Sequence, residues 1–241
     1  MDSIISKTIS NLRFPLAVMV VYVHFFGAKI NNENELLSPY YTFDSLYNII
    51  RVYISYGLCQ IAVPIFFLIS GFLFYQNLEK WNWKVWKGKI HRRFYTLMIP
   101  YLIWNIVRYL FNILPPGFHI FHHEGFQAAC LWIKDYTQPM MLWAMRDSTY
   151  PIHVPFWFIR DLMVMVVLTP FFYPLIKNKF LCRCLLGVLL VCYLLNLMPP
   201  IPGLSIESLL FFNLGGGFCL LISFNVRLIN LYYALMLSLH I

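Results

Sequence analysis

The sequence predicts an all-α fold, a polytopic bundle of transmembrane helices with about six to seven spans. Hydrophobic residues make up 60% of the 241 residues and charged residues only 12%, about half the charged share of an ordinary soluble domain. The mean hydropathy is +0.67, which leaves too little polar surface to cover a soluble domain. The apolar residues also fall into long runs, and each span needs about 20 of them.

Six long apolar runs predict the spans, and a shorter run follows them. The first run follows Ser10 and Asn11, which are candidate N-caps, and Pro15 stands in its first turn, where proline is tolerated. The long runs cover residues 12–28, 52–75, 94–114, 156–176, 181–198 and 204–224. The last run starts near Leu228 and is too short to span comfortably, so we expect that the protein either ends abnormally or is a fragment.

Basic residues mark alternate loops between these runs. Lys and Arg gather at the chain start, in the 76–93 loop and around residues 177–183, whereas the loop after the first run mixes Lys29 with acidic residues. The positive-inside rule therefore predicts a cytoplasmic N-terminus and an outside location for residues 115–155. Membrane orientation also explains the net charge of +8, so we predict no nucleic-acid partner.

A cleaved signal peptide is a second interpretation of the first run, since its basic start and the Gly27-Ala28 end are compatible with cleavage. We favour a retained span, because the run is long and because His24 is unusual in a cleaved core.

Metal binding is a weak interpretation of this sequence. The six cysteines form no CxxC pair and are read as small hydrophobic residues in helices. His119, His122, His123 and Glu124 form an HxxHHE pattern, but their order differs from the HExxH zinc helix. The preceding Pro115–Gly117 segment also predicts a turn. We therefore predict no metal cofactor.

Arg13 and His24 are ionisable residues within or beside the first span. They are eleven residues apart, close to three helical turns, so both project from one face about 16 Å apart. Arg13 is predicted at the cytoplasmic border and His24 in the outer half of the membrane. A neutral histidine at this depth is suited to take a proton from a nucleophile. A structural contact between helices is the equal alternative.

Three further ionisable residues are predicted near the depth of His24. Arg108 lies late in the third run, and Arg160 and Asp161 lie early in the fourth. Such groups are costly in lipid and are therefore candidates for function. Asp161 has two predicted roles, pairing with Arg108 or orienting His24. For Arg160 we expect snorkelling to the outer headgroups.

Arg92 and Arg93 open the third run from the cytoplasmic side. Clustered arginines suit phosphate recognition, because the guanidinium fork is fixed and always charged. The positive-inside rule is an equally good explanation that needs no ligand.

Five segments, in this order, resemble the membrane acyltransferase-3 family, whose members acylate bacterial surface glycans and related acceptors. The segments are Arg13-Phe14 with His24, then Val63–Phe72, then Arg92-Arg93 with Ile99–Tyr101, then Pro155–Arg160, and finally Phe211–Gly215. The sequence departs from the family at Thr96, where a second arginine often follows the first by three residues. Members also usually have more helices, so we expect residues 1–241 to be a single membrane-embedded domain whose C-terminal spans are missing.

The resemblance implies transfer of an acyl group from cytoplasmic acyl-coenzyme A to a hydroxyl of a cell-surface or lipid-linked glycan. The expected acyl group is acetyl. It also implies the inner membrane of a bacterium, with membrane lipid as a further partner. His24 would act as the general base, supported by Asp161 and Arg108. Three basic residues would hold the nucleotide of the donor: Arg13, Arg92 and Arg93. Exclusion of water would protect the thioester.

Two other functions remain open at this point. A transporter or channel subunit also keeps charged residues inside spans, but it predicts inverted repeats or paired broken helices, which the sequence does not show. An inactive, truncated member of the family that acts only as an assembly partner is the second alternative.

Overall fold

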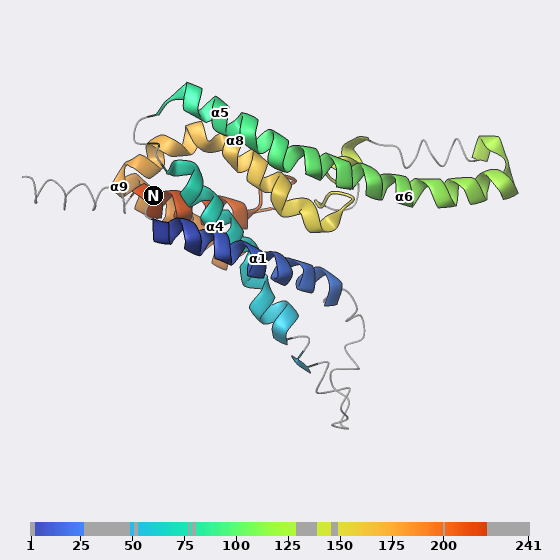
Figure 1. Cartoon of the computed structure of the whole chain (residues 1–241), viewed down its shortest axis with the longest axis horizontal. Coiled ribbons are helices and arrows are strands. Elements are labelled where there is room, and N and C mark those ends of the chain that lie inside the picture. The colour runs from blue at the N-terminus through green and yellow to red at the C-terminus, as the bar shows by residue number, and fades with distance from the viewer. Residues whose placement is uncertain are drawn as a thin grey trace, which may run out of the picture.

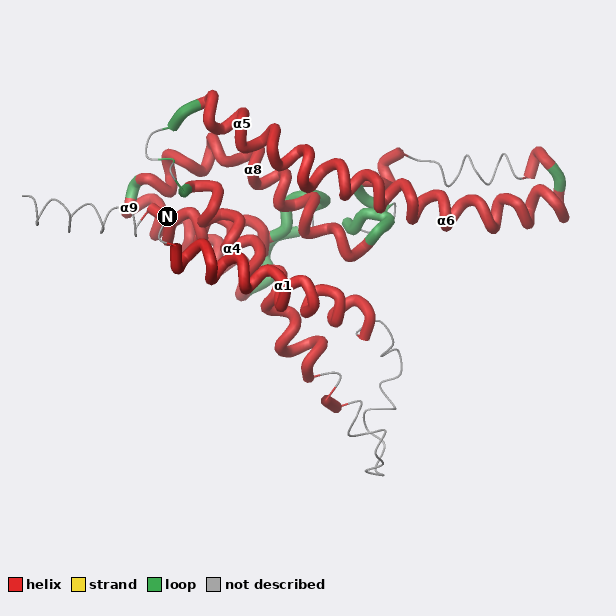
Figure 2. The backbone as a smooth tube through the Cα atoms, viewed as in Figure 1, coloured by secondary structure: helices red, strands yellow, loops and turns green. Residues whose placement is uncertain are grey.

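The computed structural model of the chain describes residues 3–26, 49–50, 53–76, 78, 81–128, 139–145, 149–199 and 201–220. Within these residues the fold consists of helices and short connecting turns, with one isolated bridge between Ile201 and Leu204 and no strand (Figures 1 and 2). The predicted all-α class is therefore confirmed for this part of the chain.

Within the residues that the structure describes, the fold has six labelled α-helices and one further helix. They are α1 (Ser3–Phe26), α4 (Ala62–Tyr75), α5 (Trp83–Arg93), α6 (Ile99–Glu124), α8 (Trp157–Lys177), α9 (Lys179–Leu194) and Ile206–Leu220. Two of them are extended by other helical turns. A π-helix at Tyr53–Leu58 and a 3₁₀ turn at Cys59–Ile61 lead into α4, and a π-helix at Phe94–Met98 joins α5 to α6 without a break.

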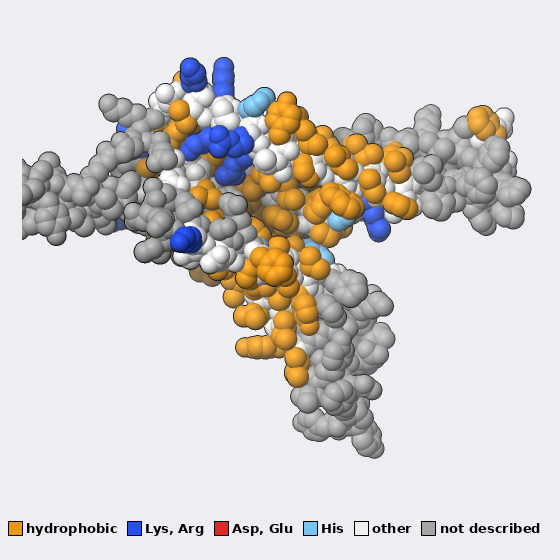
Figure 3. Space-filling view, in the orientation of Figure 1, with side chains coloured by type: hydrophobic (Ala, Val, Ile, Leu, Met, Phe, Trp, Pro, Cys, Tyr) orange, Lys and Arg blue, Asp and Glu red, His pale blue; other side chains and the backbone are white. Residues whose placement is uncertain are grey.

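Two helical segments of the described chain are long and apolar enough to cross a membrane, by length and composition. They are Tyr53–Tyr75 and Val154–Lys177, and they coincide with the second and fourth predicted runs. The Ile206–Leu220 helix is apolar but shorter. The total of six to seven spans stays a prediction. Apolar side chains cover much of the surface seen in Figure 3, which suits lipid better than water.

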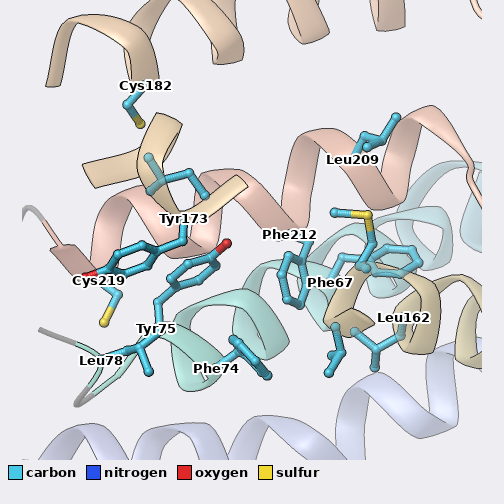
Figure 4. Close-up of a cluster of buried hydrophobic side chains, with 13 residues drawn as sticks. Phe67, Phe74, Tyr75, Leu78, Leu162, Tyr173, Cys182, Leu209, Phe212 and Cys219 are labelled. Carbon is cyan, nitrogen blue, oxygen red and sulfur yellow. The ribbon is translucent and has the colours of Figure 1, made fainter. Parts of the chain in front are cut away.

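The centre of the bundle is formed by α4, α8 and the Ile206–Leu220 helix, whose side chains meet in one core. Tyr75 stacks on Tyr173 with ring centroids 6.5 Å apart, and Phe212 packs against Tyr75 at 6.1 Å (Figure 4). α1 packs along α4, and α5 packs against α8. The start of α1, α5 and the junction of α8 with α9 lie at the same end of the bundle (Figure 1).

Glycines allow α4 and the Ile206–Leu220 helix to touch through their backbones. A Cβ placed on Gly71 would collide with the carbonyl of Phe212, and one placed on Gly215 would collide with the carbonyl of Leu68. Small residues at a helix crossing permit this close approach, which membrane helices use in place of a hydrophobic driving force. The close crossing therefore sets the relative position of these two helices at the centre of the bundle.

We expect Gly215→Ala to destabilise the fold by about 1–3 kcal/mol, because the added methyl group has no space and the backbone must move. Unfolding in detergent, followed by circular dichroism, measures the change. Gly187→Ala is the matched control, since Gly187 in α9 has open space around its Cβ position and alanine favours a helix. Equal stabilities of the Gly215→Ala variant and the parent chain would contradict the close crossing.

Pro170 in α8 creates the attachment point for α5. Proline has no N–H, so the carbonyl of Val166 loses its partner four residues later in the helix. The indole Nε1 of Trp86 donates to this carbonyl at 3.3 Å and to Thr169 Oγ1 at 3.0 Å. The Thr169 hydroxyl also donates to the Val166 carbonyl at 2.6 Å. A helix defect in α8 thereby becomes a binding point for α5.

Two local predictions are wrong. Ser10 and Asn11 do not cap the first helix, because α1 begins at Ser3 and contains Pro15 in its interior. The predicted turn at Pro115–Gly117 is also absent, because α6 continues to Glu124. The prolines leave the carbonyls of Phe111 and Asn112 without helical partners. Both residues are exposed, so solvent can satisfy these carbonyls.

Candidate active site

A cavity of about 970 Å³ lies between the C-terminal part of α1, the beginnings of α4 and α8, and the beginning of the Ile206–Leu220 helix. The end of the bundle that holds α5 is called the basic end, because α5 is rich in Lys and Arg. The cavity lies at the opposite end (Figure 1). Polar side chains from several elements line it: His24, Gln60, Arg160, Asp161, Asn196 and Glu207. Apolar neighbours such as Val20, Val63 and Trp157 complete the wall.

Arg160 and Asp161 form a buried ion pair on the wall of this cavity. Arg160 is 2% exposed and Asp161 is 1% exposed. The Nε and Nη2 atoms of Arg160 donate to Asp161 Oδ1 at 3.0 and 2.9 Å, and the backbone N–H of Ser205 donates to Oδ2 at 3.0 Å. Both carboxylate oxygens thus have partners, as a buried charge requires.

The predictions for these charged residues are partly wrong. Arg160 does not snorkel to headgroups, since its guanidinium turns inward and also donates to the carbonyls of Trp143 and Thr149 at 2.5 and 2.7 Å. The ion pair of Asp161 is with Arg160 and not with Arg108, whose side chain is exposed and does not line the cavity. His24 and Asp161 do share the cavity wall, but a role of Asp161 in orienting His24 stays a prediction.

The segment before α8 is held against the bundle by polar contacts from α6. The Tyr101 hydroxyl donates to the carbonyl of Leu142 at 2.5 Å, and the backbone N–H of His153 donates to Asn105 Oδ1 at 3.0 Å. Asn105 is fully buried and its Nδ2 donates to the Tyr101 carbonyl at 2.8 Å. These bonds fix the backbone that leads to Arg160, and so they fix one wall of the cavity.

The residues predicted to bind phosphate, at the basic end of the bundle, differ in their contacts and in their exposure. Arg93 Nη2 donates to the carbonyl of Ser70 at 3.2 Å, and its guanidinium lies 5.5 Å from the ring centroid of Phe74. Burial lowers the pKa of Arg93 to about 10, which leaves it charged at neutral pH. Arg92 is exposed. The side chain of Arg13 lies outside the described residues, so its predicted convergence with the other two stays a prediction.

Lys89 is an inward-facing cation that sequence reasoning counted only as part of a basic loop. Its ammonium donates to the carbonyls of Phe74 and Gln76 at the end of α4, where the helix dipole is negative. Burial, with a contribution from nearby Arg93, lowers the pKa of Lys89 to about 8. Lys89 therefore caps α4, whereas Lys84 and Lys87 of α5 are exposed. Figure 3 shows Lys and Arg side chains on the surface at this end of the molecule.

Glu207 and His153 are site residues that sequence reasoning missed. Glu207 lines the large cavity, and its signal was an acidic residue in the first turn of an apolar run. His153 lines a second, apolar groove of about 410 Å³ that also contains His24. It lies just before the fourth run, so a search restricted to charges within the spans did not reach it.

The protein is thus a helical bundle with one cavity that is lined by a histidine, a buried ion pair and a glutamate. Such a site is suited to acid–base chemistry. The sequence profile of a family described as an acyltransferase domain matches residues 7–239. The chain belongs to this family, the acyltransferase-3 family, and the resemblance found in five segments of the sequence is confirmed.

The chain is also similar to the succinoglycan biosynthesis protein ExoH of Rhizobium meliloti (strain 1021). The two are 26% identical over 242 residues, which cover 97% of this chain and 59% of that protein. The chain thus spans about 59% of the length of this relative. No solved structure matches the chain.

Proposed function

We propose that the protein moves an acyl group from cytoplasmic acyl-coenzyme A to a hydroxyl of a cell-surface or lipid-linked glycan. Membership of an acyltransferase family supports the reaction class. The similarity to a protein of succinoglycan biosynthesis supports a polysaccharide acceptor. The observation that carries the proposal is the cavity in which His24 from α1 faces polar side chains of other elements.

His24 is the proposed general base, which takes the proton of the acceptor hydroxyl as the oxygen attacks the thioester carbon. The C–O bond forms, the C–S bond breaks, and the proton passes to the departing thiolate. The Arg160–Asp161 pair holds the cavity wall in a fixed geometry. Arg108, in the first half of α6, remains a proposed member of the polar layer, since its charge acts on His153.

The basic end of the bundle is the proposed entry for the nucleotide of the donor, with acetyl-coenzyme A as the first donor to test. Arg92 is exposed and can therefore contact a phosphate. Arg93 contacts α4 through one N–H group, and the other N–H groups of its guanidinium can donate to a ligand. Arg13 is the third proposed member on the sequence pattern alone. We propose no metal and no nucleic acid in the reaction.

The proposed topology places the N-terminus and α5 in the cytoplasm, with residues 115–155 outside, in the inner membrane of a bacterium. In a chain whose six native cysteines are replaced by alanine, an impermeant thiol reagent on intact spheroplasts should label Gln127→Cys and leave Lys87→Cys unlabelled, since both residues are exposed but on opposite predicted sides. Both variants should react in permeabilised membranes, which is the control. Labelling of Lys87→Cys in intact spheroplasts would contradict the orientation.

The reaction itself is tested with membranes that contain the protein, radiolabelled acetyl-coenzyme A and a bacterial exopolysaccharide acceptor. We expect label in the glycan that mild alkali releases, because an ester of a hydroxyl is base-labile. Membranes without the protein are the control. Incorporation at the control level with acetyl-coenzyme A and with other acyl-coenzyme A donors would argue for the alternatives of a transporter-like protein or an inactive family member.

A further inference from the structure

His24 stands between two spaces of different character. On one side is the large polar cavity, and on the other is the groove of about 410 Å³. The groove is lined by side chains of α1, α4 and the start of α8, among them Val20, Phe66, Phe156 and Phe158. Of the residues that line it, only His24 and His153 carry a side-chain nitrogen or oxygen. The groove is therefore an apolar space with two imidazoles.

His153 is fixed in this groove by contacts on several sides. Its ring stacks on Phe156 with centroids 4.4 Å apart and planes at 21°, and it meets Trp104 edge-on at 6.5 Å. Its backbone N–H is bound to the buried Asn105. Side chains locked by packing and hydrogen bonds are the kind that hold a ligand in a defined position.

The Nδ1 atom of His153 is buried and has no hydrogen-bond partner among the residues that the structure describes. A buried polar atom without a partner costs about 1–3 kcal/mol, and buried side-chain polar atoms generally have partners. Because Nδ1 is closed off from the groove, Nε2 is the ring nitrogen that can meet a ligand there. Burial lowers the pKa of His153, a hydrogen bond with its own backbone raises it, and the charge of Arg108 lowers it, so that the net shift favours the neutral ring.

We propose that His153 binds the carbonyl oxygen of the acyl donor, with Nε2–H donating to it while His24 acts as base. This inference rests on the acyltransferase function proposed above. Once His24 takes the hydroxyl proton, His153 is the remaining side chain of the groove that can donate to the oxygen. Negative charge builds on this oxygen as the C–O bond forms and returns to the C–S bond as the thiolate leaves, so His153 keeps its proton throughout.

The apolar groove makes such a hydrogen bond effective. In a site of low dielectric constant a fixed donor stabilises developing charge more than water does, and it costs no reorganisation during the reaction. Loss of one donor of this kind typically lowers turnover about 100- to 1,000-fold. His153 would thus be a second catalytic residue, recruited from the segment that precedes α8.

Two donor analogues test the inference by binding alone. In one, a methylene replaces the thioester sulfur and the carbonyl is kept; in the other, a thioether replaces the thioester and the carbonyl is lost. We expect His153→Ala to weaken binding of the ketone analogue about 2- to 12-fold, the range of one net hydrogen bond, and to leave the thioether analogue unaffected. Equal affinities of both analogues before and after the change, or equal weakening of both, overturn the inference.

Turnover gives the second readout. We expect His153→Ala to lower the rate of acyl transfer about 100- to 1,000-fold, with partial recovery in His153→Asn, which keeps a side-chain N–H donor. His91→Ala is the matched control, because His91 is exposed on α5. Full turnover in His153→Ala, or equal losses in the Ala and Asn variants with lowered unfolding temperatures, overturns the inference. A parent protein that binds neither analogue and transfers no acyl group contradicts the proposed function itself.

Discussion

His24→Ala is expected to lower turnover about 100- to 10,000-fold, the usual contribution of a general base. The imidazole is the group of α1 that reaches the wall of the polar cavity and also borders the apolar groove. No neighbouring side chain of α1 on these walls can replace it, since Ala17, Val20, Val21 and Val23 are apolar. The initial rate of ester formation from labelled acyl-coenzyme A measures the effect.

The His24→Ala substitution should slow the chemical step and leave folding and donor binding unchanged. Because His24 is partly exposed and borders two open spaces, the unfolding temperature and the donor affinity should stay close to those of the parent chain. His91→Ala, whose histidine is exposed on α5 and lines neither space, should retain full turnover. If His24→Ala also retained full turnover, the histidine would be structural and another base would have to be found.

Arg160→Met is expected to destabilise the protein by about 3–5 kcal/mol, the cost of leaving a buried charge without its partner. Asp161 would keep only the Ser205 N–H, and the carbonyls of Trp143 and Thr149 would lose their donor. The double variant Arg160→Met/Asp161→Leu should be less destabilised than Arg160→Met alone, because no unpaired charge then remains. Denaturant unfolding in detergent measures the two free energies.

Arg183→Met is the control for this series, because Arg183 is exposed on α9 and such surface changes usually stay within about 0.5 kcal/mol. Asp161→Asn separates structure from chemistry. A stable Asp161→Asn variant without turnover would support the predicted catalytic role of Asp161. An Arg160→Met variant as stable as the parent chain would show that the ion pair contributes little to the fold.

The sequence predicted the helical class and the approximate depth of the site residues, but it did not predict their partners. Counting along the spans placed His24, Arg160 and Asp161 at similar depth, and all three line one cavity. The pairing of Arg160 with Asp161 was out of reach, because adjacent residues of a helix do not normally face each other. The pair forms at the start of α8, where Arg160 also reaches carbonyls of the preceding segment.

Other features required information that a linear pattern does not contain. The ligand role of Arg93 stays a prediction, but its contacts with the Ser70 carbonyl and Phe74 were not foreseen. A basic residue near a phosphate and one near the end of a helix look the same in a sequence, since both positions attract positive charge. His153 was missed for a different reason: its burial depends on Phe156 and Asn105, and neither marks a site by itself.

The uninterrupted helix formed by α5, its π-helical continuation and α6 has a consequence for the membrane itself. At 1.5 Å per residue it is about 60 Å long, roughly twice the thickness of a hydrocarbon core. Tilting within the usual range cannot remove such an excess, so with the predicted third span in the hydrocarbon core this rod extends into water at one or both of its ends. The distance between the two ends of the rod is set by peptide hydrogen bonds and does not change with the thickness of the bilayer.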